Sequence, residues 1–293
     1  MIKKEDVLVI DGRNFLYISV YALHRRLGFT KSLEDYTEEQ QAIFLDKLKG
    51  DLLYYLNSML HDFKCTSFYF VIDGTYSFRK HFFDGYKDNR DEKPYLIRKG
   101  EELLLTTWSK EFQWKILSQN GMEGDDWMAV ITRDKTKNYF LATGDEDMHM
   151  LTHYDNVHVI SIVKRTVFSS QQVDIPSGYY LQIINGMDVA YEKLWMGCKS
   201  DLVPKILPKG KGEKAYKEWW QNYDSWLRNS YEEIGKKTFT NSVYFDIDPT
   251  LIYRNFELTC LLHEYHDEIL KSKKMEPKPF VDYLNKTQNN FFI

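Results

Sequence analysis

Val7-Leu8-Val9-Ile10-Asp11-Gly12, at residues 7–12, is a short apolar run that ends in an acid and a glycine. The same order returns at residues 68–74, Phe68-Tyr69-Phe70-Val71-Ile72-Asp73-Gly74. Runs of this length and composition predict buried strands. An Asp-Gly pair after a strand is often only a turn. Acids normally lie on hydrated surfaces, however, so their repeated placement at strand ends favours a shared site for divalent metal.

The pattern around these runs predicts alternating strands and helices over about the first 165 residues. A capping box of Thr37 and Gln40 announces one helix, which should end near His61. The other helices are expected at about 13–26, at about 95–117 and from Glu123, and the strands at 6–11, 67–73, 139–143 and 157–163. This alternation predicts an α/β fold, with a Rossmann-like parallel sheet that is flanked by helices on both faces.

Further acids follow the predicted strands and open one predicted helix. Side chains beyond the carboxyl ends of parallel strands converge on one crevice, and Asp11, Asp73, Asp145 and Asp147 all occupy that position. The segment 144–147 could equally be a helix N-cap or a loop. Glu123, Asp125 and Asp126 begin a helix that could direct two carboxylates at the same crevice. So many acids repel one another unless cations neutralise them, and all-oxygen ligation suits Mg²⁺ or Mn²⁺ rather than Zn²⁺.

Composition sets the limits on function. The chain has 293 residues, of which 43% are hydrophobic and 28% charged. It has no apolar run near the roughly 20 residues of a membrane span, and its first residues lack a secretory pattern. We therefore expect a cytoplasmic protein without a membrane partner. Three scattered cysteines, with no CxxC pair, indicate neither a disulfide framework nor a thiolate zinc site.

The net charge of −4 conceals two basic blocks. The basic segment, residues 79–99, has seven Lys or Arg and four acids (7 − 4 = +3), and residues 199–217 have six and two (6 − 2 = +4). A solvated helix face would explain such a block. Aromatic residues are interleaved in the first block, and aromatic rings can stack on unpaired bases while Lys and Arg follow a nucleic-acid backbone. The combination favours a nucleic-acid interface.

Six motifs, in this order, give the chain a family resemblance over about residues 7–215. They are 9–12 (VIDG), 71–74 (VIDG), 86–90 (YKDNR), 123–129 (EGDDWMA), 143–147 (TGDED) and 196–201 (MGCKSD). The chain resembles the structure-specific 5′ nucleases, which include flap endonucleases, the 5′ nuclease domain of bacterial DNA polymerase I and phage 5′–3′ exonucleases of the RNase H type. Spacing and length are most similar to the phage members.

The resemblance implies a PIN-like nuclease domain at 1–178, with a helical arch at about 76–117. It implies a helical domain at 179–293 that includes a helix-hairpin-helix-like region at about 186–220. It also implies two Mg²⁺ ions, for which Mn²⁺ can substitute, held by Asp11, Asp73, Glu123, Asp125, Asp126, Asp145, Asp147 and Asp201. Asp11, Asp73, Glu123 and Asp145 would hold the tighter ion, and Asp147 and Asp201 would lie nearer the second.

The same resemblance implies DNA contacts. Lys80 and Lys87 would hold the scissile phosphate. Together with Asp11 and Asp73 they form the expected catalytic set. Arg79 and Arg90 lie beside the two lysines and would also contact DNA. Duplex DNA would contact Lys199, Lys209, Lys211 and Lys214, with K⁺ as a candidate ion at the hairpin. One departure stands out: Cys198 occupies a position where the family commonly has Asp, and a thiol is a poor ligand for Mg²⁺.

The resulting expectation is a two-metal-ion phosphodiesterase with 5′–3′ exonuclease and flap endonuclease activity on DNA 5′ ends or flaps. RNase H activity on RNA–DNA hybrids and primer removal in DNA replication or repair are further expectations. So are a monomeric state, a replication-protein partner and, for a phage protein, the host cytoplasm. One alternative is a nucleic-acid-binding protein of the same fold with impaired catalysis. Another, a phosphatase with an acidic nucleophile, is disfavoured because Asp11 is not part of a DxD motif.

Overall fold

The structure is a computed structural model that describes residues 4–81, 83–186, 188–189, 255, 258, 259 and 261. The chain divides into two compact units. The first comprises Met1–Ser77, Glu92–Asn185 and Leu262–Ile293, and the second comprises Phe78–Asp91 and Gly186–Leu261. Several predicted positions lie outside the described residues: Cys198, Lys199, Asp201, Lys209, Lys211, Lys214 and most of the hairpin region at 186–220.

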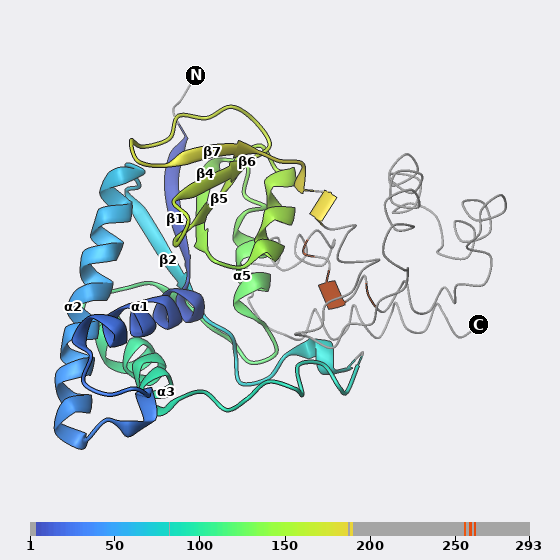
Figure 1. Cartoon of the computed structure of the whole chain (residues 1–293). Helices are drawn as coiled ribbons and strands as arrows, with labels where there is room; N and C mark the ends of the chain where they lie inside the picture. Colours follow the sequence, from blue (N-terminus) through green and yellow to red (C-terminus); the bar gives the residue numbers. More distant parts are fainter. Residues whose placement is uncertain are drawn as a thin grey trace. The chain divides into compact units, whose positions relative to one another are not determined.

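Strands and helices alternate along the first unit, as the sequence predicts (Figure 1). The strands are β1 (Glu5–Asp11), β2 (Ser67–Val71), β3 (Ile116–Leu117), β4 (Lys137–Thr143), β5 (Val157–Ser161), β6 (Thr166–Ser169) and β7 (Tyr180–Ile183). The α-helices are α1 (Gly12–Leu27), α2 (Glu38–Asp62), α3 (Tyr95–Leu103), α4 (Ser109–Glu111) and α5 (Gly124–Ile131). Short 3-10 helices are η1 (Leu33–Asp35), η2 (Phe78–His81) and η4 (Glu146–His153), and η3 (Leu104–Trp108) is a π-helix.

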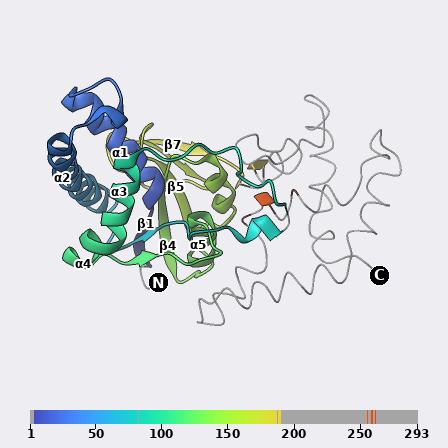
Figure 2. The same ribbon diagram turned by 90° about the horizontal axis from the view of Figure 1, so that it is seen from below.

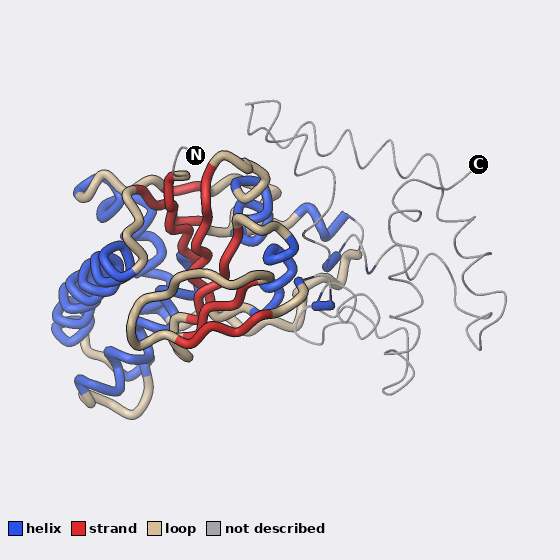
Figure 3. The backbone as a smooth tube through the Cα atoms, turned by 90° about the horizontal axis from the view of Figure 1, so that it is seen from above, coloured by secondary structure: helices blue, strands red, loops and turns tan. Residues whose placement is uncertain are grey.

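The strands form one sheet in the order β3-β2-β1-β4-β5-β6-β7 (Figure 3, red). Every neighbouring pair is parallel except β5 and β6, which are antiparallel. The predicted parallel sheet is confirmed, and β1 lies inside it between β2 and β4. The sequence pattern missed β6 and β7, which extend the sheet beyond the predicted strands.

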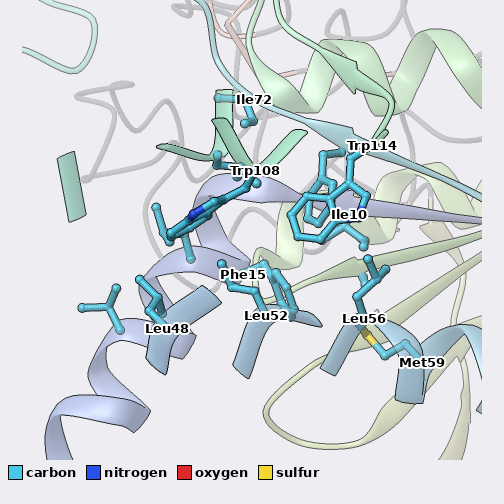
Figure 4. Packing of buried hydrophobic residues seen from close by; sticks show 14 of the residues in the cluster. Ile10, Phe15, Leu48, Leu52, Leu56, Met59, Ile72, Trp108 and Trp114 are labelled. Carbon is cyan, nitrogen blue, oxygen red and sulfur yellow. The ribbon is translucent and has the colours of Figure 1, made fainter. Parts of the chain in front are cut away.

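Helices cover both faces of the sheet. Figures 1 and 2 show α1, α2 and α3 together on one face, while α5 lies on the other and contacts β1 and β2. Leu8 and Ile10 of β1 belong to the core cluster, to which α2 contributes Leu48, Leu52 and Leu56. Figure 4 shows Ile10 close to these α2 side chains. These α2 residues are four apart, the spacing of one helix face. Burial of this apolar stripe holds α2 on the sheet.

Local signals set the ends of the main helices. Asp11 caps α1 by accepting a hydrogen bond from the Asn14 N–H at 2.9 Å, and α1 ends at Gly28, whose φ of 61° suits glycine. The predicted capping box of Thr37 and Gln40 opens α2. None of the helices among the described residues is both long and apolar enough to cross a membrane.

Two predicted helical regions differ from the structure. The helix expected at about 95–117 ends at Glu111, because Gln113 has a φ of 55° and the chain then pairs Ile116 with Phe70 as β3. In the expected arch, the described residues before Tyr95 form only η2 and a series of turns. The segment from Asp84 to Asp91 is rich in Asp, Asn and Gly, which favour turns over helix.

Candidate metal centre

Three acids follow neighbouring strands at the carboxyl edge of the sheet. Asp11 pairs with Val71 across β1 and β2, and Ile10 pairs with Ala142 across β1 and β4. Asp73 lies two positions beyond Val71, and Asp145 lies two beyond Thr143, the residue after Ala142. The register therefore brings Asp73 and Asp145 to either side of Asp11.

Asp11 interacts electrostatically with both Asp73 and Asp145. Burial, and after it the Asp73 and Asp145 carboxylates, raise the pKa of Asp11 to about 6. Hydrogen bonds from the Asn14 N–H and from the Thr143 hydroxyl to Asp11 oppose this increase. A partly buried acid between two other acids is a position where a cation would favour the charged form.

A ring of hydrogen bonds joins the turn after β1 to the turn after β4. The Thr143 Oγ1 donates to Asp11 Oδ2 at 2.9 Å, and the Gly144 N–H donates to Asn14 Oδ1 at 2.8 Å. The Asp145 N–H donates to the Thr143 Oγ1 at 3.1 Å. Asp145 also caps η4 by accepting from the Asp147 N–H at 2.9 Å. The Thr143 hydroxyl and the Asp147 N–H thus position Asp11 and Asp145.

The first turn of α5 is tied to the end of β2. The Gly124 N–H donates to Asp73 Oδ1 at 2.7 Å. Asp126 Oδ2 accepts from the Glu123 N–H at 3.0 Å, so Asp126 caps the helix that carries it. Glu123 and Asp126 are buried and Asp125 is partly exposed. The hydrogen bond from Gly124 therefore holds the start of α5, which carries the three predicted acids, beside Asp73.

Arg13 contributes the basic group of the site, and the sequence analysis assigned it no role. Its Nη1 forms an ion pair with Asp73 Oδ2, and its Nη2 forms one with Glu101 Oε1 at 2.9 Å. Lys93 Nζ contacts the other oxygen of Glu101 at 2.6 Å. Burial opposes the charge of Arg13, but Asp73 and Glu101 raise its pKa, so it stays cationic. The only sequence signal was an arginine two positions after a predicted metal ligand.

The donor chemistry fits a hard divalent cation. Asp11, Asp73 and Asp145 supply only carboxylate oxygens, which Mg²⁺ and Mn²⁺ prefer. Burial, and after it the Asp73 and Asp145 charges, raise the pKa of Asp11, and a bound cation would oppose this increase. Among the described residues, no three acids, histidines or cysteines are grouped closely enough to hold a metal ion as they stand. Arg13 is the cation paired with Asp73 in this arrangement.

Three of the four predicted DNA-binding residues in the basic segment are accessible. Lys80 forms an exposed ion pair with Asp88, Lys87 lies 4.9 Å from the Tyr86 ring centroid, and Arg90 is exposed. Lys87 has a φ of 60°, which places it in a turn rather than a helix. Phosphate groups could reach these side chains.

Arg79 differs from the other three because it is buried, with 2% of its surface exposed. Its Nε donates to the Leu258 carbonyl at 3.1 Å, and its guanidinium lies over the Phe78 ring at 4.7 Å. Tyr86 is also buried, in a small cluster with Leu258 and Phe83. These contacts favour a packing role for Arg79 over the predicted contact with DNA, since its charge is directed inward.

Comparisons with known proteins agree on the fold. Residues 6–176 match the 5′-3′ exonuclease, N-terminal resolvase-like domain. A crystal structure of the bacteriophage T5 flap endonuclease, a pseudo-enzyme-product complex with DNA and metal ions, has a TM-score of 0.59 and 17% identity, over 96% of this chain and 98% of that chain. The T5 protein co-crystallised with metal ions gives 0.61 and 14%, over 92% and 98% of the two chains.

A mutant of the T5 5′-exonuclease is also similar, with a TM-score of 0.53 and 16% identity, over 92% of this chain and 98% of that chain. No curated protein sequence matched the chain. At these identities the solved structures show a shared fold, while the match to the exonuclease domain covers more than half of the chain.

Proposed function

The chain belongs to the 5′-3′ exonuclease family of structure-specific 5′ nucleases, and we propose from this that it hydrolyses phosphodiester bonds near the 5′ ends or flaps of DNA with divalent metal. The observation that best supports the metal dependence is the position of Asp11, partly buried between Asp73 and Asp145 at the carboxyl edge of the sheet. A divalent cation would offset the mutual repulsion of these three carboxylates and favour their charged forms.

The proposed ligands of the tighter ion are Asp11, Asp73, Glu123 and Asp145, with Asp147 and Asp201 nearer the second ion and Asp125 and Asp126 completing the set. These residues would hold two Mg²⁺ ions, or Mn²⁺ in their place, which would supply positive charge for activating a water and stabilising the leaving 3′ oxygen. Asp11 and Asp145 would keep their places through the hydrogen bonds from Thr143 and Asp147. Asp73 would keep its place through Gly124.

The basic segment supplies the proposed contacts with the DNA strand. Lys80 and Lys87 would bind the scissile phosphate, and Arg90 would follow the backbone, since all three are accessible to phosphate. Arg79 would support them by holding the segment through Leu258. Lys199, Lys209, Lys211 and Lys214 are the proposed contacts with duplex DNA, with K⁺ at the hairpin.

The finer assignments rest on the family alone. We propose a monomer that removes primers in DNA replication or repair, with RNA–DNA hybrids as a second substrate and a replication protein as a partner. Cleavage of an RNA–DNA hybrid in parallel with a DNA flap would test the substrate assignment. A hybrid left intact under conditions that cleave the flap would limit the activity to DNA.

A second candidate is binding without efficient cleavage. The observation that favours it is the ion pair of Arg13 with Asp73, because a guanidinium already neutralises a proposed metal ligand. Cys198 also favours this candidate, because it occupies a position where the family commonly has an acid that could bind metal.

The deciding experiment is cleavage of an end-labelled 5′-flap duplex. We expect product with Mg²⁺ or Mn²⁺, and none after addition of a chelator. Binding of the same flap should be followed in parallel, by fluorescence anisotropy. Tight binding with no product in either metal, at any excess of protein, would refute the nuclease proposal and favour the binding protein.

A further inference from the structure

Arg13 connects a carboxylate of the candidate metal centre to a carboxylate outside it. Its two terminal nitrogens contact different acids, Asp73 at the end of β2 and Glu101 in α3. Only 24% of the Arg13 side chain and 14% of the Glu101 side chain are exposed, so both charges are largely removed from water. Charges in such a position must be paired, because desolvation is costly.

Glu101 is built to hold a cation independently of Asp73. One of its oxygens accepts from Arg13 and the other from Lys93, at 2.9 Å and 2.6 Å. Although burial works in the opposite direction, these two cations lower the pKa of Glu101. Arg13 would therefore remain paired with an acid if it lost its contact with Asp73.

The situation of Asp73 is different. Its Oδ1 accepts from the Gly124 N–H, and its Oδ2 is paired with Arg13. A divalent cation that uses Asp73 together with Asp11 and Asp145 would compete for the oxygen that Arg13 occupies. The guanidinium and the metal ion are alternative partners of one carboxylate, and like charges so close would repel.

We propose that Arg13 is a positioning residue that acts as an exchangeable counterion: it pairs with Asp73 when no divalent ion is bound, and withdraws to Glu101 when one binds. This inference rests on the metal centre of the proposed function. It has two consequences. Arg13 stabilises the metal-free fold by offsetting the repulsion between Asp73 and Asp11, and it weakens the binding of the divalent ion, because the Arg13–Asp73 pair must break first.

The test is Mn²⁺ binding to the full chain, measured by isothermal titration calorimetry and by the EPR signal of free Mn²⁺. Arg13→Gln should bind Mn²⁺ roughly three- to tenfold more tightly than the wild type, because the competing charge is gone. Its Tm in chelator should fall, and the rise in Tm on addition of Mn²⁺ should exceed that of the wild type. Unchanged or weaker Mn²⁺ binding by this variant would overturn the proposal.

Two variants of arginines serve as comparisons. Arg13→Lys keeps the charge but loses the fork that reaches two acids at once, so its Mn²⁺ affinity should lie between those of the wild type and Arg13→Gln. Arg26→Gln removes a charge from the same helix, where Arg26 pairs with Asp51 at 2.6 Å and is 56% exposed. Its Mn²⁺ affinity should equal that of the wild type; a gain as large as that of Arg13→Gln would make the effect one of net charge and contradict the proposal.

Glu101 provides an independent arm. Glu101→Gln should weaken Mn²⁺ binding, because Arg13 then has Asp73 as its remaining acidic partner. This loss should disappear in the double variant with Arg13→Gln, since Glu101 acts through Arg13. A loss of equal size with and without Arg13 would mean that Glu101 acts directly on the metal ion and would refute the exchange.

These binding measurements separate the inference from the nuclease proposal. A wild type that binds Mn²⁺ and cleaves the flap, with an Arg13→Gln variant that binds no more tightly, would overturn the inference alone. Tighter binding by Arg13→Gln in a protein that does not cleave would support the inference and refute the nuclease. A wild type with no Mn²⁺ binding and no cleavage would refute both.

Discussion

The Gly124 N–H donates to Asp73 Oδ1 at 2.7 Å, which ties the start of α5 to the end of β2. The two residues are 51 positions apart in the chain. A Cβ on Gly124 would lie 3.3 Å from the same oxygen, so the close approach suits glycine. Asp73 therefore has a structural partner as well as a proposed role in metal binding.

Asp73→Asn should abolish cleavage of a 5′ flap and retain binding of the flap. The asparagine oxygen can still accept from Gly124, so the fold should survive, but the charge that a divalent ion requires is lost. We expect at least about a hundredfold decrease in the single-turnover rate, with a flap Kd within about threefold of the wild type. Unchanged turnover would remove Asp73 from the site.

Asp88→Asn should strengthen DNA binding by releasing Lys80. The ion pair of these residues is about half exposed, so it contributes little to stability and breaks easily. We expect roughly two- to threefold tighter flap binding, measured by anisotropy in chelator. Asp84→Asn is the matched control, since it removes an exposed acid of the same segment that forms no ion pair with Lys80 in the structure. An equal gain in both variants would mean that overall charge, not the pair, sets the affinity.

Gly74→Ala should destabilise the protein by roughly 2–4 kcal/mol, because overpacked sites of this kind force backbone shifts. A Cβ at Gly74 would lie 2.1 Å from the Gln119 carbonyl oxygen and 2.9 Å from the Asn120 Cα, and neither backbone atom can move away freely. Unfolding in urea, followed by circular dichroism, measures the change.

Gly50→Ala is the opposite control for that measurement. Nothing lies within 4 Å of a Cβ at Gly50, in the middle of α2. The substitution should therefore stabilise the protein by about 0.5–1 kcal/mol through helix propensity. A Gly74→Ala variant as stable as the wild type would contradict the close approach of residues 119 and 120.

Burial of His158 should cost stability as the pH falls below about 6.5, in opposition to Asp11, whose raised pKa favours the folded state as the pH falls. Burial lowers the pKa of His158 from 6.5 to about 4 in the folded protein. Above pH 6.5 the imidazole is neutral in both states. At lower pH the unfolded chain takes up a proton that the folded chain does not, so unfolding is favoured, by about 2 kcal/mol at pH 5 for this one group.

His158→Gln should remove that part of the loss. The comparison is the free energy of unfolding in urea at neutral pH and near pH 5, with His61→Gln as the control, because the His61 side chain is 90% exposed. If His158→Gln loses as much stability as the wild type between the two pH values, His158 is not the group responsible.

The central sheet could be predicted because each of its inner strands carries its own signal. Apolar runs such as 7–10 are buried on both faces, and helical segments separate most of the inner strands, which is enough to predict parallel order. β7 gives no such signal: its residues Tyr180–Ile183 are largely exposed, and it is a strand because its backbone pairs with β6. Pairing between short segments leaves little trace in composition.

The candidate site was predictable only in part, for the same reason. The positions of Asp11, Asp73 and Asp145 follow from strand order, which the pattern reveals. Arg13 and Glu101 are 88 residues apart, and no local rule pairs them. An arginine such as Arg79 is expected at the surface, but here it is buried and hydrogen-bonded to Leu258, 179 residues away. Long-range contacts of single side chains remain beyond a pattern read along the chain.

The hydrogen-bond ring around Asp11 means that the repulsion between neighbouring carboxylates arises during folding rather than during ligand binding. Thr143, Asn14 and Gly144 hold the two turns in register through the protein's own groups. Asp11 and Asp145 are thus brought to neighbouring turns during folding, before any ligand binds. Like charges held close together at this edge of the sheet lower the free energy of unfolding of the metal-free protein. Substitutions that remove one of these charges should therefore stabilise the metal-free protein and slow the proposed cleavage.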